Sequence, residues 1–238
     1  MIFRYLLLSF FMCCNLFAQE IDSRYVLSGG IAHIGNGEVI DNSTIIIDKG
    51  KIVAIGPSNS VIINKKRAQV YDITGKHVYP SFILPNTTLG LVEIDAVRAT
   101  RDHRESGEIN PNVRSQPAYN TESIVVSTVR TNGILLAQVT PRGGLISGTS
   151  SIMQLDGWNW EDATYLEDDG IHINWPEDYN KNYWGHSHNF TSGSDSDHDD
   201  EHNEIRDYID TLIQFFNEAR QYQTLSNKKP DLKLESLK

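Results

Sequence analysis

The region that most constrains the fold is the stretch from Arg24 to Val61, where short β-branched runs alternate with turn signals. Asn36-Gly37 and Lys49-Gly50 supply residues that tolerate a positive φ, which tight hairpin turns require. Short runs between such turns predict antiparallel hairpins. With a further short run over 69–73, the pattern predicts a small β domain spanning residues 19–79.

The pattern changes after Pro80. Residues 81–84 predict a brief buried strand, and residues 121–131 predict a helix that ends at Asn132-Gly133. Residues 134–139 predict another buried strand, because this apolar run is too short for a helix. The order strand, helix, strand with crossover spacing predicts a parallel α/β sheet or barrel over 80–238.

The N-terminus predicts a secretory signal peptide over residues 1–18. Arg4 supplies the positive end, residues 5–17 are almost entirely apolar, and Ala18 offers a small residue at the cleavage site. We therefore expect an exported protein, periplasmic or secreted. Both cysteines, Cys13 and Cys14, lie in this segment, so the mature chain needs a core that is stable without disulfides. No later apolar run reaches ~18 residues, so we expect no membrane span after cleavage.

The charge balance excludes one class of partner. The chain has 21 Lys and Arg against 31 Asp and Glu, a formal net charge of −10. A broad basic face for a phosphate backbone is not expected on such a chain, so nucleic acid is not a predicted partner. The motifs of P-loop proteins, zincins and α/β-hydrolases are also missing from the sequence.

Three separated blocks, residues 30–40, 45–56 and 72–83, resemble in this order the opening of the amidohydrolase superfamily, in its imidazolonepropionase-like branch. A weaker resemblance continues through 129–133, 137–144 and 155–158. The resemblance implies a small β-sandwich followed by a metal-dependent (β/α)8 barrel. It also implies a divalent, zinc-like metal and hydrolysis of C–N bonds other than peptide bonds, in cyclic amides or peptide-like substrates.

Two features depart from that family. Its first barrel strand ends in a His-x-His pair that binds metal, whereas Asn86 and Thr88 stand at the corresponding positions here. An amide and a hydroxyl are poor substitutes for imidazole at a transition metal, so we expect no metal at this position from this chain alone. A full barrel needs ~250 residues, and residues 80–238 number 159. We therefore expect an α/β protein with a partial barrel, truncated or split, inactive alone and completed by a partner chain or a second copy.

A glycine- and hydroxyl-rich region follows the predicted strand 134–139. In a barrel, the loops after the strands face the active site. Exposed backbone N–H groups and an arginine there could hold a carbonyl or carboxylate. A pair of tight turns explains the region equally well. The candidate substrate-binding residues are Arg142, Gly143, Gly144, Ser147 and Thr149.

A second candidate site is the His/Asp-rich segment 185–204, which we expect to form a loop before a helix over 203–225. Short histidine-rich tracts bind zinc or copper, but charged runs more often form solvated loops. We expect residues 231–238 to approach the next barrel strand. The candidate loop ligands are His186, His188, His198 and His202.

Three functions stay open on the sequence. The chain belongs to a hydrolase in which a metal-activated hydroxide attacks an amide carbon, or it is a non-catalytic exported binding module, or it binds metal through the His/Asp loop.

Overall fold

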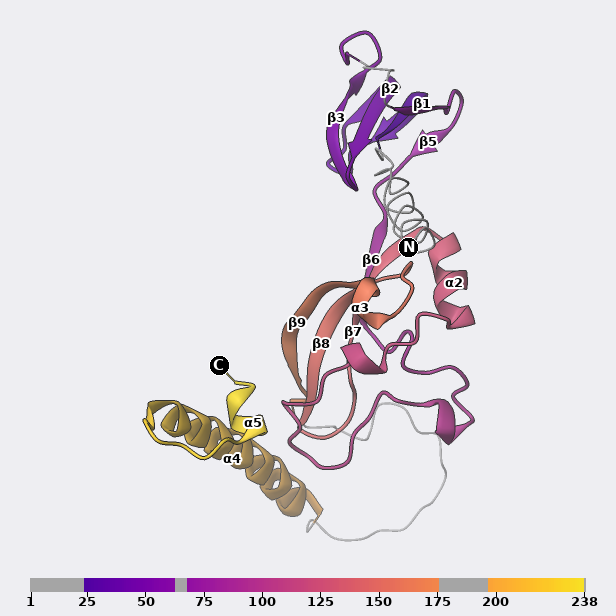
Figure 1. Cartoon of the computed structure of the whole chain (residues 1–238). Coiled ribbons are helices and arrows are strands. Elements are labelled where there is room, and N and C mark those ends of the chain that lie inside the picture. The colour runs from indigo at the N-terminus through magenta and orange to yellow at the C-terminus, as the bar shows by residue number, and fades with distance from the viewer. Residues whose placement is uncertain (1–23, 63–67, 176–196, 238) are drawn as a thin grey trace, which may run out of the picture. The chain divides into compact units, whose positions relative to one another are not determined.

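The computed structural model describes residues 24–62, 68–175 and 197–237, with side chains of the long C-terminal helix described from Ile205. The chain divides after Pro80 into two compact units (Figure 1). Each unit is described by itself. The predicted signal peptide lies outside the described residues.

The N-terminal unit holds one five-stranded sheet. The strands are β1 (Tyr25–His33), β2 (Val39–Asp48), β3 (Lys51–Pro57), β4 (Gln69–Asp72) and β5 (His77–Val78). The sheet order is β3-β2-β1-β4, with β5 also paired to β1. Strands β1, β2 and β3 are antiparallel neighbours, which confirms the predicted hairpins, whereas β4 and β5 run parallel to β1.

Local turn chemistry explains these hairpins. Lys49 and Gly50 adopt φ values of 51° and 74° between β2 and β3, in the left-handed region that glycine occupies without strain. Val26 of β1 pairs with Ile46 of β2, and both side chains are buried, so they lie on one apolar face of the sheet. Burial on that face fixes the register, because a slip by one residue would turn these side chains to the other side.

The C-terminal unit contains a four-stranded mixed sheet, ordered β6-β7-β8-β9. Its strands are β6 (Phe82–Thr87), β7 (Ile134–Val139), β8 (Ile146–Gln154) and β9 (Thr164–Ile173). Strands β6 and β7 are parallel and are joined through α2 (Ile124–Thr131), as the strand–helix–strand pattern predicted, although α2 begins three residues later than expected. The predicted strand over 81–84 is present, but its predicted burial is wrong, because Phe82 and Ile83 are exposed. The structure thus shows a mixed α/β protein with two sheets, and a partial barrel stays a prediction.

The sequence did not predict β8 and β9, which are antiparallel to their neighbours. Residues 147–151 were expected in a loop or in tight turns, but they lie within β8. Their small hydroxyl side chains and Gly148 look like turn residues in sequence. In the fold, the first six residues of β8 are all buried, because small side chains let other segments pack against this strand.

The main core of this unit lies between α2 and the sheet. Ser123 caps α2 by accepting a hydrogen bond from the Val125 N–H. The unit also has three short helices, η2 (Arg98–Thr100), η3 (Gln116–Ala118) and α3 (Trp160–Ala163). Of these, η3 and α3 contact β8, whereas η2 has no buried residue. The buried core residues are Leu89, Leu91, Tyr119, Val126, Ala137, Val139, Met153, Leu155 and Ala163.

The chain ends in α4 (Asp197–Thr224) and α5 (Leu232–Glu235). The predicted helix is confirmed, but it starts earlier, so residues 197–204 belong to the helix and not to the expected loop. In the segment expected to approach a further strand, the Asp231 side chain caps the short helix α5, and the further strand stays a prediction. Leu212 and Phe215 of α4 form a second buried cluster with Leu145 and Ile146. No helix within the described ranges is long and apolar enough to cross a bilayer.

Candidate functional site

A chain of polar side chains joins the four strands of the C-terminal sheet. The Asn86 N–H donates to Gln138 Oε1 at 3.1 Å, which links β6 to β7. Gln138 Nε2 donates to Asp169 Oδ2 at 2.6 Å, and Ser150 Oγ donates to Asp169 Oδ1 at 2.7 Å, which links β7 and β8 to β9. Because both oxygens of this carboxylate accept hydrogen bonds, Asp169 is fixed in one orientation.

Arg142 closes the network at the end of β6. One of its NH groups donates to Asn86 Oδ1 at 2.8 Å and the other to the Asn86 main-chain oxygen at 2.6 Å. Asn86 has a φ of 48°, in a region that asparagine visits more readily than most residues. The Arg142 main-chain N–H also donates to the His103 carbonyl at 2.6 Å. The guanidinium is therefore a fixed positive charge at the strand end.

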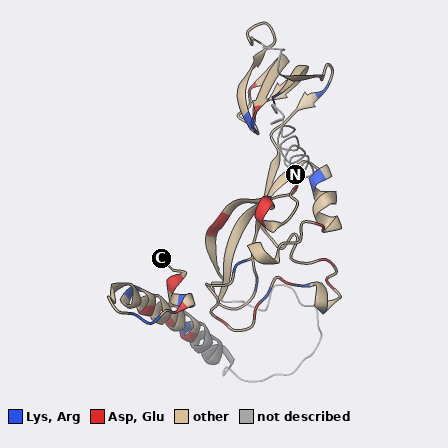
Figure 2. Ribbon diagram, viewed as in Figure 1, with Lys and Arg blue, Asp and Glu red and all other residues tan. Residues whose placement is uncertain are grey.

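His172 lies at the other end of the network. Its Nε2 is 2.8 Å from Ser150 Oγ. Burial lowers the pKa of His172, and the charge of Arg142 acts in the same direction, while Asp169 opposes them. The imidazole is therefore neutral at neutral pH. Acidic residues of β9 lie in this region, as the red stretch of that strand shows (Figure 2).

The polarity of these bonds does not suit a nucleophilic serine. Ser150 has one hydroxyl hydrogen, and two oxygens that can only accept it lie within reach, Asp169 Oδ1 at 2.7 Å and the Gly170 carbonyl at 3.2 Å. His172 Nε2 must then donate to Ser150, which leaves it no lone pair with which to take the serine proton. In a serine hydrolase the base accepts that proton, and the carboxylate orients the base. The cluster contains the three residue types but connects them in a different order.

The residues at the family's metal position do not fit a divalent cation. Asn86 Oδ1 accepts from a guanidinium, so a metal bound there would meet a permanent positive charge within hydrogen-bond distance. The remaining candidate at this position, Thr88, offers only a hydroxyl. Within the described ranges, no group of three or more His, Cys, Asp or Glu side chains is placed to hold a metal.

The five predicted binding residues have different surroundings, and their contact with a substrate stays a prediction. Only Arg142 joins the network. A Cβ at Gly143 would lie 2.6 Å from Arg104 Nε, and one at Gly144 would lie 2.7 Å from the Glu108 carbonyl oxygen. Both glycines therefore allow a close approach of the loop that precedes η3.

The two hydroxyl residues of that prediction are buried. Ser147 Oγ accepts from Asn174 Nδ2 at 2.8 Å, and Thr149 Oγ1 donates to the Pro111 carbonyl at 2.9 Å. These bonds hold neighbouring segments against β8. Gln138, Ser150, Asp169 and His172 are not among the residues that the sequence predicts for a site. A signal was present in Gln138, which is polar in an otherwise apolar run and so marks a side chain with a polar partner.

The predicted loop metal site is not tested. His186 and His188 lie outside the described residues. His198 and His202 lie in the first turns of α4, where side chains are not described.

Comparison with known proteins places this fold. No family model matches the chain, and no curated protein matches it. An amidohydrolase structure from Thermotoga maritima MSB8 is similar over 89% of this chain and 54% of its own, with a TM-score of 0.66 and 17% identity. At that identity the likeness shows the fold alone.

Two prolidase structures overlap smaller parts of the chain. One was solved with N-methylphosphonate-L-proline and matches with a TM-score of 0.26 and 26% identity, over 31% of this chain and 17% of its own. The other, a putative prolidase from Bifidobacterium longum, matches with a TM-score of 0.28 and 19% identity, over 54% and 30%. The chain spans about half the length of the Thermotoga protein.

Proposed function

We propose that this chain has an amidohydrolase-type fold that binds a small molecule bearing a carboxylate or an amide carbonyl, and that it does not hydrolyse C–N bonds by itself. The observation that carries the proposal is the guanidinium of Arg142 bonded to Asn86, at the position where the family resemblance implies a metal ligand.

The remaining capacity of Arg142 supports ligand binding. A guanidinium has five N–H donors, and Asn86 accepts two hydrogen bonds from it. The others can face an incoming oxygen. Because the fork of a guanidinium matches the two oxygens of a carboxylate, a bidentate pair is the favoured contact. Asp169 does not occupy these donors, since its two carboxylate oxygens accept from Gln138 and Ser150.

A second candidate function is metal-dependent hydrolysis by a larger assembly. In this proposal a further polypeptide, in a partner chain or a second copy, extends the sheet to an imidazolonepropionase-like barrel and brings the metal ligands. Two observations favour it: the fold likeness covers only 54% of the Thermotoga amidohydrolase, and β6 pairs only with β7 among the described strands. Phe82 and Ile83 on β6 are 71% and 59% exposed, so apolar side chains of this strand are left for other parts of a larger barrel to cover.

Export through the 1–18 signal and metal binding by the His/Asp segment also remain proposals. Zinc titration of the mature chain and of a variant lacking residues 186–202 tests the latter. Uptake of zinc that the deletion removes would support this site, and no uptake at micromolar zinc would exclude it.

The main proposal is tested with dihydroorotate-like, hydantoin-like and dipeptide compounds, with and without zinc. Calorimetry is expected to detect binding of the compounds that carry a carboxylate. Arg142→Lys keeps the charge but loses the planar fork, so we expect at least tenfold weaker binding; Arg220→Lys, on the exposed face of α4, is the matched control. Hydrolysis by the purified chain would overturn the proposal, and it would favour the second candidate if the active species were an oligomer.

A further inference from the structure

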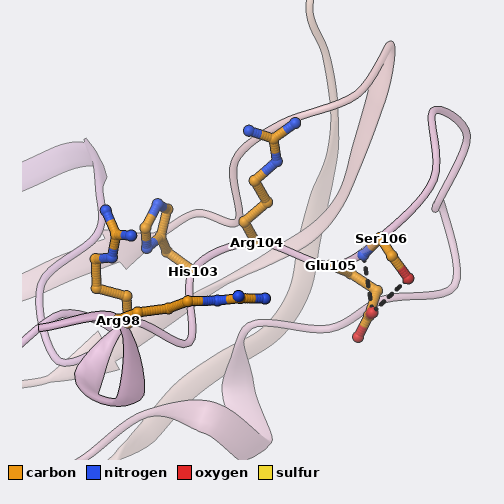
Figure 3. A pocket seen from close by; sticks show the side chains of 6 residues that line it. Arg98, His103, Arg104, Glu105 and Ser106 are labelled. Carbon is orange, nitrogen blue, oxygen red and sulfur yellow. Dashed lines mark hydrogen bonds between the residues drawn. The ribbon is translucent and has the colours of Figure 1, made fainter.

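A second basic feature, separate from the network on the sheet, is a pocket in the loop that follows β6. Its volume is about 320 Å³, within the range of small-molecule sites. In Figure 3, His103 and Arg104 point to the same side, while Glu105 turns towards Ser106. The lining residues are Arg98, Arg101, His103, Arg104, Glu105 and Ser106.

The arginines of this pocket have little internal compensation. Within the part of the chain that the structure describes, Arg98 and Arg104 make no ion pair and no side-chain hydrogen bond. Arg101 has one carboxylate partner, Asp95, at 3.8 Å. The Asp95 side chain is 89% exposed, so water screens this pair strongly.

The one carboxylate in the lining is already engaged. Glu105 Oε1 accepts from the Ser106 N–H at 2.8 Å and from Ser106 Oγ at 3.1 Å. These two bonds lower the pKa of Glu105, so it stays ionised, but it is bonded to serine and not to a guanidinium. Three arginines against one carboxylate leave the lining with an excess of positive charge, in a chain whose formal net charge is −10.

The backbone holds this loop in place. The Leu145 N–H donates to the Glu108 carbonyl at 2.7 Å, and the Thr149 N–H donates to the Val113 carbonyl at 2.7 Å. With the bond from Arg142 to His103, the loop runs alongside the start of β8 over several residues. Gly143 adds a specific fit, because the Arg104 side chain passes where a Cβ would stand. A site whose charges are set on a fixed backbone loses less entropy when a ligand binds.

From these observations we infer that the pocket binds a small polyanion, a molecule with at least two phosphoryl or carboxylate groups. Three guanidinium groups around one cavity match several negative charges better than one. This inference goes beyond the proposed function and rests on different side chains, since Arg142 does not line the pocket.

The experiment is calorimetric titration of the full mature chain with tripolyphosphate, citrate and inorganic phosphate at low ionic strength. We expect one site per chain, with tripolyphosphate or citrate bound at least tenfold more tightly than phosphate. If tripolyphosphate binds more tightly than citrate, the site prefers phosphoryl groups; if citrate binds more tightly, it prefers carboxylates. Absence of binding at millimolar tripolyphosphate and citrate would overturn the inference, as would equal affinity for all three anions.

Variants locate the site. Arg98→Gln, Arg101→Gln and Arg104→Gln are each expected to weaken tripolyphosphate binding about tenfold, the loss of one charge-assisted hydrogen bond. Arg220→Gln makes the same chemical change on the exposed face of α4 and is expected to bind like the wild type. Equal weakening by Arg220→Gln, or wild-type affinity in all three pocket variants, would contradict the assignment.

A second readout avoids substitution altogether. Phenylglyoxal modifies accessible arginines, and mass spectrometry gives the extent at each position. Tripolyphosphate is expected to protect Arg98, Arg101 and Arg104 but not Arg220. Equal protection of all four arginines would show a general effect of ionic strength and would contradict a binding site in the pocket.

Discussion

The Arg142 guanidinium donates to Asn86 at two points, to Oδ1 at 2.8 Å and to the main-chain oxygen at 2.6 Å. This pair joins the end of β6 to the loop after β7, across 56 positions of sequence. It places an organic cation where the family resemblance implies a divalent metal. The chemistry at this sheet edge is therefore expected to be anion or carbonyl binding, and the variants below test the parts that hold it.

Comparing Asn86→Gly with Asn86→Ala separates two contributions of Asn86 to the free energy of unfolding: its side-chain hydrogen bond and its left-handed backbone conformation. Glycine accepts the φ of 48° and loses only the Oδ1 acceptor, so we expect the free energy of unfolding to fall by about 1 kcal/mol. Alanine loses the same acceptor and also pays a left-handed backbone cost of roughly 1–2 kcal/mol. Urea unfolding followed by tryptophan fluorescence measures both, since all four tryptophans lie after residue 80. Equal values for the two variants would contradict the strain argument.

Gly143→Ala is expected to disturb Arg104. The substitution adds a Cβ 2.6 Å from Arg104 Nε and forces alanine to adopt a φ of 88°. We expect a loss of at least about 1 kcal/mol in unfolding free energy and weaker tripolyphosphate binding. Gly133→Ala, at a φ of 85° with open space around the Cβ, carries the backbone strain alone and is the matched control. If the control weakens anion binding as much, Gly143 does not position Arg104.

Tyr119→Phe is expected to stabilise the protein or leave it unchanged. The Tyr119 hydroxyl is buried and has no hydrogen-bond partner among the described residues, so it carries an uncompensated desolvation cost. Removing the hydroxyl is expected to raise the free energy of unfolding by up to about 1 kcal/mol. Urea unfolding at pH 8 measures this, and Tyr165→Phe, at a 67% exposed position, is the control.

The same hydroxyl predicts an alkaline pH dependence. Burial raises the pKa of Tyr119 to about 12, above the ordinary value of 10.0. A folded-state pKa above the unfolded value means that stability is full below pH ~10 and is lost as the pH rises towards 12. We expect this decline in the wild type and a smaller one in Tyr119→Phe. Identical declines in both proteins would contradict the burial of the hydroxyl.

His172 predicts an acid pH dependence of opposite sign. Burial holds the pKa of His172 below its ordinary value of 6.5, so the unfolded chain takes up the proton more readily than the folded one. Stability is therefore full above pH ~6.5 and falls as the pH drops below it. His172→Gln keeps an amide that can donate to Ser150, and we expect a flatter stability curve between pH 7 and 5. If the dependence of unfolding free energy on pH between 7 and 5 were unchanged in the variant, His172 would not contribute to the acid loss of stability.

Phe215 and Phe216 test how α4 is held. Phe215 is 8% exposed and belongs to the cluster with Leu145 and Ile146, whereas the adjacent Phe216 is 41% exposed. We expect Phe215→Ala to lower the free energy of unfolding by about 3 kcal/mol and Phe216→Ala by less than 1 kcal/mol. A larger loss of unfolding free energy for Phe216→Ala than for Phe215→Ala would mean that the opposite face of α4 packs against Leu145 and Ile146.

Local signals predicted a good part of this fold. The hairpins of the first unit follow from turns such as Lys49-Gly50, and α2 and β7 follow from the stop at Asn132-Gly133 and a short apolar run. The Ser123 cap that sets the start of α2 was not predicted. Strand β8 escaped prediction because Gly148 and the serines around it resemble a turn, and only tertiary packing makes a strand of them.

The polar network of the C-terminal sheet was harder to predict from the sequence. Arg142 was selected for its place after a strand, but its partner Asn86 was noted only as a missing metal ligand. The contact between Gln138 and Asp169 depends on the antiparallel course of β8 and β9, which the sequence did not predict. Side-chain partners that distant strands bring together are set by register, and local pattern carries no information about it.

The most direct test of the central claim is an NMR titration that follows the Asn86 side-chain amide and the Arg142 Nε–H signals. The mature chain is titrated with N-acetylglycine, which carries both a carboxylate and an amide, and separately with zinc. We predict that N-acetylglycine shifts both signals with a saturating curve and that equimolar zinc leaves them in place. Saturating shifts with zinc and none with N-acetylglycine would contradict the account.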